Sequence, residues 1–285
     1  MKRLQPLRKD IGSFWLRYRR NRMAVVAIGI LAFLVFMTSI ASQITPYGPD
    51  ATSAENFVSP SVEHPLGTDD LGRDVFSRVV HGSRISITVG VFAGLMSLII
   101  GISIGVTSGY AGGRIDSLLM RSVEVIQVIP RFFFAILLIA IFGSTIWNII
   151  VAIGLLGWPS TARIVRAEVL SAKELPFVEA ARLSGLSDFK IMFSEILPNT
   201  ITSAIVNTAL LSAAAIISEA GLSFLGLGDP NAVSLGLLLQ QSYVFLQRAW
   251  WCALFPGIFV TLIVLGLNLL TDGITAALSS EREGR

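Results

Sequence analysis

The sequence FVEAARLSGLSDFKIMFSEILPN, residues 177–199, is a polar interruption between two apolar stretches of this 285-residue chain. Pro176 stands just before it and suits the first turn of a helix, where a backbone N–H has no helical partner. Small side chains then recur at helical spacing and predict one mostly small face, made by Phe177, Ala180, Ala181 and Ser184. Gly185 follows where a helix of about two turns would end with a residue in the left-handed region.

A second helix is predicted directly after this turn. Ser187 is placed to cap it, and the helix would run through Ile191 to Leu197 and Pro198 into the next apolar stretch. Glu179 lies in the first turn of the short helix, where the helix dipole favours an anion. Because a helix this short is marginal in water, the stretch is predicted to need a partner surface.

The composition predicts an all-α integral membrane protein. Hydrophobic residues make up 53% of the chain and charged residues 14%, and the mean hydropathy is +0.71. A membrane-spanning helix needs about 20 apolar residues. Candidate spans occur at six places, residues 23–41, 85–107, 118–142, 145–164, 197–218 and 251–271. Gly154, Gly157 and Pro159 are expected to break the fourth.

Basic residues concentrate before the first span and in the loop that carries residues 177–199. The positive-inside rule therefore predicts that both termini, with tails 1–22 and 276–285, and this loop are cytoplasmic. Residues 42–84 would then be an extracytoplasmic loop, and 85–275 a core of five spans. The net charge of +3 reflects this topology and does not indicate nucleic-acid binding.

The spacing of residues 177–199 resembles the coupling motif of ABC importer permeases. Glu179-Ala180-Ala181, Gly185 and Leu197-Pro198 fall at the matching positions, whereas Glu195 stands where the motif has isoleucine, with Ile196 one place later. The resemblance implies a six-helix type I permease whose cytoplasmic coupling helix, residues 176–189, fits a groove in an ATP-hydrolysing subunit. The residues implied in this contact are Glu179, Ala180, Ala181, Arg182, Gly185, Leu197 and Pro198.

Two further stretches restrict the resemblance to one branch of these permeases. HPLGTDDLGRDVFSRVVHGSR, residues 64–84, and SEAGLSFLGLGDPN, residues 218–231, look like segments of the C-type subunit in the peptide/nickel branch of these permeases. The implied location is a bacterial or archaeal cytoplasmic membrane. The implied partners are a second homologous permease, two ATPase subunits that bind ATP and magnesium, and an extracytoplasmic solute-binding protein. Di- and oligopeptides are the main substrates of this branch, and nickel chelates, opines and oligosaccharides remain alternatives.

Several charged residues are candidates for the translocation path or its gate: Arg121, Glu124, Arg131 and Glu219. Arg121 could equally pair with Glu124, and Arg131 could extend toward the membrane interface. Glu219 and Asp229 are candidates for the gate or the binding-protein contact, with a capping role equally open.

In residues 64–84, Leu71, Val75 and Val79 recur at helical spacing and predict an amphipathic helix at the membrane interface. The histidines and aspartates of this stretch have no metal-site spacing, and Asp70 and Asp74 are expected to cap and to form ion pairs.

Catalysis by this chain is not expected. None of its lysines follows a glycine, so the GxxxxGK[ST] phosphate-binding loop does not occur, and Cys252 is the single cysteine. Neither metal nor cofactor is expected in the chain itself. Two other classes of function stay open, a secondary transporter or channel that works without ATPase subunits, and a membrane scaffold that uses residues 160–195 to recruit a partner.

Overall fold

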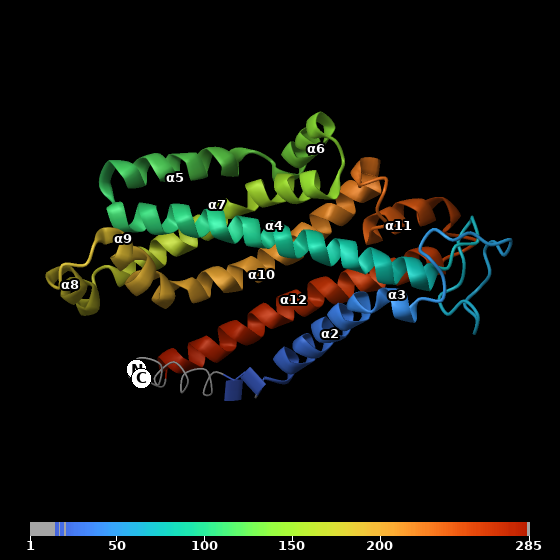
Figure 1. Ribbon diagram of the computed structural model, residues 1–285, viewed down its shortest axis with the longest axis horizontal. Coiled ribbons are helices and arrows are strands. Elements are labelled where there is room, and N and C mark those ends of the chain that lie inside the picture. The colour runs from blue at the N-terminus through green and yellow to red at the C-terminus, as the bar shows by residue number, and fades with distance from the viewer. Residues whose placement is uncertain (1–14, 17, 20, 284–285) are drawn as a thin grey trace. The chain divides into compact units, whose positions relative to one another are not determined.

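The computed structural model describes residues 15–16, 18–19 and 21–283. The chain divides into two compact units, Met1–Ile87 with Asn231–Arg285, and Thr88–Pro230 (Figure 1). In the described residues the regular structure is helical, apart from one isolated antiparallel bridge between Thr68 and Asp74. The predicted all-α class is therefore confirmed.

Helices in the first unit are α2 (Arg22–Ser39), α3 (Ala41–Ile44), the start of α4 (Val75–Ala111), α11 (Leu235–Ser242), the 3₁₀ turn η3 (Tyr243–Phe245) and α12 (Trp251–Glu283). Figure 1 shows α2 running beside α12. Small residues allow this close approach, since a Cβ added to Gly266 would lie 2.9 Å from the Leu31 side chain.

The second unit contains the rest of α4, then α5 (Gly113–Val128), α6 (Arg131–Phe142), α7 (Ile146–Ala172), α8 (Pro176–Leu183), α9 (Asp188–Lys190), the π-helical segment η1 (Ile191–Ile196), α10 (Leu197–Leu222) and the π-helical segment η2 (Ser223–Leu227). Helix α10 lies along α7 (Figure 1). Helix α4 meets α7 closely too, because a Cβ on Gly105 would lie 2.7 Å from Val165.

Within the described part of the chain, five helical stretches are long and apolar enough to cross a membrane, and the bent pair α5 and α6 would make a sixth span. The third candidate span, residues 118–142, is formed by two helices and not by one, because α5 and α6 meet at an angle of 85°. Pro130 causes the break, since it has no N–H to donate and holds the preceding Ile129 in an extended conformation, with φ −74° and ψ 126°.

The expected break in the fourth span is also wrong, because α7 continues through Pro159 to Ala172. Its glycines are packing positions. Ser97 of α4 donates a hydrogen bond from Oγ to the Gly154 carbonyl at 2.9 Å, and an added Cβ on Gly157 would collide with the same Ser97 side chain. Neighbouring helices thus accommodate a proline and two glycines within one span.

The predicted interfacial helix is absorbed into α4, a single helix of 37 residues. Leu71 lies outside it and is exposed, whereas Val75 and Val79 are buried. Asp74 caps its start, with the Ser77 N–H donating to Asp74 Oδ2 at 2.8 Å, and Arg73 Nη2 lies 3.5 Å from Asp70 Oδ1. The predicted capping and pairing roles of Asp70 and Asp74 are confirmed.

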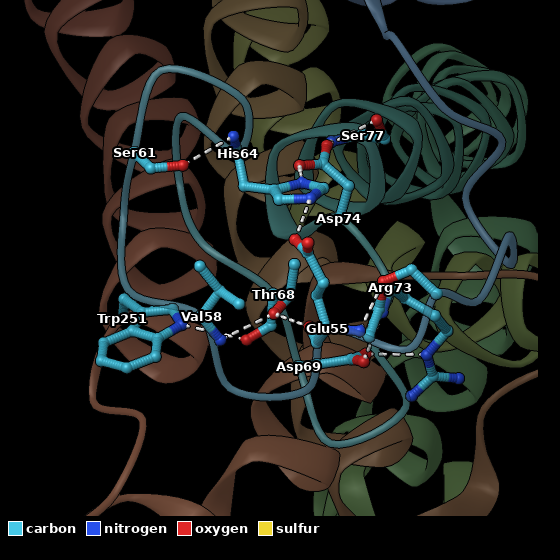
Figure 2. A network of polar contacts seen from close by, with 12 residues as sticks. Glu55, Val58, Ser61, His64, Thr68, Asp69, Arg73, Asp74, Ser77 and Trp251 are labelled. Atoms are coloured by element: carbon cyan, nitrogen blue, oxygen red, sulfur yellow. Dashed lines mark hydrogen bonds and ion pairs between the residues drawn. The ribbon is translucent and has the colours of Figure 1, made fainter.

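A polar network fixes the loop before α4 (Figure 2). Asp69 Oδ2 accepts hydrogen bonds from Arg73 Nε and Arg78 Nη1, each at 2.7 Å, and His64 Nδ1 lies 3.0 Å from Asp74 Oδ1. The Trp251 indole donates to the Thr68 carbonyl at 3.1 Å. Residues 45–74 are therefore a folded loop tied to the first turn of α12.

Candidate functional site

Helix α8 is formed as its sequence predicts. It begins at Pro176 and ends with Gly185 at φ +75°. The Gly185 N–H donates to the Arg182 carbonyl at 2.9 Å, and the Leu186 N–H donates to the Ala181 carbonyl at 3.2 Å. This pair of bonds is the Schellman ending of a helix, which requires a left-handed residue at the glycine position.

The predicted small face of α8 is corrected by the structure, which divides its members between two sides. Val178 is 0% exposed and Ala181 9% exposed, and both pack into the core of their own unit with Val106 of α4 and Val169 of α7. Ala180 points outward. Val178, which the predicted face left out, is buried on the inner side of α8. The opposite side is therefore exposed and consists of Glu179, Ala180, Arg182 and Leu183.

The helix after the turn starts at Asp188, with Ser187 in the predicted N-cap position but without a side-chain capping bond. It continues through η1 into α10, as predicted. The Leu197 N–H donates to the Met192 carbonyl, five residues back, which is the π geometry of η1, and Pro198 follows directly with no N–H of its own. Pro198 is exposed and Leu197 is partly buried.

A group of charged and polar side chains joins the ends of α4, α5 and α7. Arg166 of α7 donates from Nε and Nη2 to the two carboxylate oxygens of Asp116, each at 2.6 Å, and Ser108 donates to the same carboxylate. Two parallel bonds of this kind fix both distance and orientation. This pair joins α7 to the first turn of α5.

Three further contacts join α8 and the segments on either side of it to the end of α4. The Tyr110 hydroxyl at the end of α4 donates to Asp188 Oδ1 at 2.5 Å, and the Arg182 guanidinium lies 5.5 Å from the centre of the Tyr110 ring. Lys173 Nζ donates to the Gly109 carbonyl at 3.2 Å. Apart from Arg182, which the sequence analysis assigns to the ATPase contact, sequence reasoning missed these supporting residues, although charged side chains beside the glycine turn 109–113 and at the end of α7 were a signal.

The outer side of this region is apolar as well as charged. Leu183 is 85% exposed, and Leu175 and Phe189 are also exposed. A helix that is held rigidly and presents a large apolar side chain to the outside has the features of a surface that binds another protein.

The other candidate residues lie elsewhere in the unit. Arg121 and Glu124 are on the exposed side of α5, and Arg131 is the first residue of α6 and lines a cavity. Glu219 is 1% exposed and accepts a hydrogen bond from the Ser223 hydroxyl at 2.7 Å. Asp229 Oδ2 accepts from the Ile146 N–H at 3.0 Å and so helps to cap α7. The structure thus gives Asp229 a capping role.

These features define a multi-span helical membrane protein with a short helix mounted on one polar loop. Residues 97–283 match the family described as "Binding-protein-dependent transport system inner membrane component", and residues 11–60 match the "N-terminal TM domain of oligopeptide transport permease C". The chain belongs to the family of inner membrane components of binding-protein-dependent transport systems.

Curated relatives cover almost the whole chain. The dipeptide transport system permease protein of Bacillus subtilis (strain 168) is 40% identical over 267 residues, which are 93% of this chain and 83% of the relative. A glutathione transport system permease protein of Pectobacterium atrosepticum is 37% identical over 274 residues, 93% of this chain and 89% of the relative. The di/tripeptide transport system permease protein of Pseudomonas aeruginosa is 33% identical, with 93% and 90% covered.

Proposed function

We propose that this chain is the C-type permease subunit of an ATP-driven importer of short peptides. The observation that carries the proposal is the likeness, along 93% of the chain, to permeases named for dipeptides, di- and tripeptides and glutathione. These named substrates share a short peptide backbone and a free carboxylate. Nickel chelates, opines and oligosaccharides are the competing substrate classes.

The chain would form half of the translocation path, and a second homologous permease the other half. Two ATPase subunits would bind ATP and magnesium on the cytoplasmic side, and an extracytoplasmic binding protein would deliver the peptide. ATP would favour the closed ATPase dimer, and the differential affinity of ATP for that state would shift the permeases between inward and outward access.

Helix α8 would be the contact with one ATPase subunit. Its exposed Leu183, beside Glu179 and Arg182, suits an apolar groove with a charged rim. The buried side, through Val178 and Ala181, would carry any displacement of α8 to α4, α7 and α10, whose residues form the same core.

Orientation is tested with single cysteines. In a Cys252→Ser background, Val62→Cys, at a position 100% exposed, should react with a membrane-impermeant thiol reagent in intact cells. Ser187→Cys should react only after the membrane is opened, because the excess of basic residues supports a cytoplasmic position for that loop. Reaction of Ser187→Cys in intact cells would reverse the proposed topology.

Uptake by the complete complex in liposomes tests the function. Labelled dipeptide should accumulate only with ATP on the ATPase side and with the binding protein present. A lysine substitution in the phosphate-binding loop of the ATPase subunits should abolish uptake. ATP-independent uptake would support a secondary transporter, assembly without any uptake would support a scaffold, and uptake of a nickel chelate or trisaccharide in place of dipeptide would reject the peptide assignment.

A further inference from the structure

A small cavity lies among four helices of the second unit. Its volume is about 60 Å³, and α4, α6, α7 and α10 all contribute to its wall. The wall is apolar except for three residues, Ser97, Arg131 and Ser218. At about 10–15 Å³ for each buried water, the cavity has room for about four waters, or for a carboxylate group but not for a whole peptide.

The cavity lies near the middle of a candidate span, because Ser97 in its wall is close to the centre of residues 85–107. Ser97 is 14 residues before the end of α4 at Ala111, which corresponds to about 21 Å along the helix axis at 1.5 Å per residue. The hydrocarbon layer is about 30 Å thick. A charge at this depth is costly, and arginines found there usually serve a ligand, an ion pair or a water-filled path.

Arg131 has no ion-pair partner among the residues that the structure describes. Its side chain is exposed in the isolated chain while it lines the cavity, so a ligand can reach it. Its backbone is held firmly, because Pro130 precedes it and the neighbouring Phe132 packs on α10, where a Cβ on Gly221 would lie 3.3 Å from the Phe132 ring.

The two serines of the wall do not compete as donors. The Ser97 hydroxyl donates to the Gly154 carbonyl and the Ser218 hydroxyl to the Ala214 carbonyl, each at 2.9 Å. The guanidinium of Arg131 is therefore the charged donor of the cavity. It stands at the start of α6, where the helix dipole adds to the positive potential and Pro130 offers the first turn no side-chain cap.

We propose that Arg131 receives a carboxylate of the transported peptide at the break between α5 and α6, and so makes the permease itself selective for anionic peptide ends. This proposal rests on the proposed function. A carboxylate matches the guanidinium in charge and hydrogen-bond geometry, and its size matches the cavity.

The test compares two dipeptides that differ only at the carboxyl end, one with a free carboxylate and one amidated. Each is supplied at a concentration that saturates the same binding protein, and ATP-driven uptake is measured for the original complex and for Arg131→Gln. Because the binding protein is the same in both complexes, its own preference cancels in the ratio. Arg131→Gln should lower uptake of the free-carboxylate peptide about tenfold or more, the size of a lost charge-assisted hydrogen bond, and leave the amidated peptide unchanged.

Arg131→Lys should restore part of the selectivity, because it keeps the charge without the planar geometry. Arg114→Gln, which removes an exposed arginine of α5, is the matched control and should change neither peptide. Equal loss for both peptides would make Arg131 structural, and no loss for either would remove it from the path, so both results overturn the proposal. If the original complex takes up neither peptide, the proposed function fails and this inference fails with it.

Discussion

Substituting Gly185 changes the end of α8 without changing its packing. A Cβ built on Gly185 meets no atom within 4 Å, so alanine adds only the cost of holding an L-residue at φ +75°. That cost is about 1–2 kcal/mol, which lowers the population of the correctly ended helix about five- to thirty-fold relative to frayed forms. Valine should cost more, since its β-branched side chain tolerates positive φ poorly. Asparagine should cost least, because it enters the left-handed region readily.

Uptake and substrate-stimulated ATP hydrolysis by the reconstituted complex should therefore fall in the order asparagine, alanine, valine. Hydrogen exchange in residues 176–186 should rise in the same order, while the affinity of the binding protein for peptide stays unchanged. Gly226→Ala is the matched control, because Gly226 also has positive φ and open space around it but lies at the other end of α10. Full uptake by Gly185→Val would show that the Schellman ending of α8 is not needed for coupling.

Two substitutions separate the outer and inner sides of α8. Leu183→Ser should reduce co-purification of the ATPase subunits and leave the thermal stability of the chain unchanged. Val178→Ala should destabilise the chain by about 2 kcal/mol, because it removes buried methyl groups. Equal effects of the two variants on both measurements would refute the division of α8 into two sides. Arg166→Gln should destabilise the chain by about 1–3 kcal/mol, since it breaks two charge-assisted bonds to Asp116. Thermal unfolding in detergent measures this loss of stability, with the exposed Arg163→Gln as control. An unchanged unfolding temperature would contradict a stabilising role for the Arg166–Asp116 pair.

The ends of α8 could be predicted from the sequence because their causes are local. Pro176 at the start and Gly185 at the end act through backbone conformation alone, which a single residue type decides. The spans were predictable for a similar reason, because burial in lipid is a property of about 20 consecutive residues. Pro130 carries the same kind of local signal as Pro176, and an interruption of the third span is predictable from it.

The supporting contacts could not be predicted because they join residues that are far apart in sequence. Asp116 and Arg166 are separated by 50 positions, Tyr110 and Asp188 by 78, and Thr68 and Trp251 by 183. A short window shows that charged and aromatic side chains lie near helix ends, but it does not show which of them meet. The inward orientation of Ala181 could not be predicted for the same reason, since the side that a two-turn helix buries depends on the core against which it packs.

Prolines have opposite consequences in this unit, and the packing around each explains the difference. Pro159 leaves α7 continuous because the preceding Trp158 is buried between α4 and α5 and the small Gly157 packs against Ser97 of α4. At Pro130 the preceding residue is extended, and α5 and α6 meet at a sharp bend. Arg131, the first residue after this bend, is exposed. If α8 is the coupling helix, the continuous α7 would move with it through their shared core. The break at Pro130 places Arg131, the charged residue of the cavity wall, where two helix directions change. Coupling and selectivity would then depend on separate elements of the same unit.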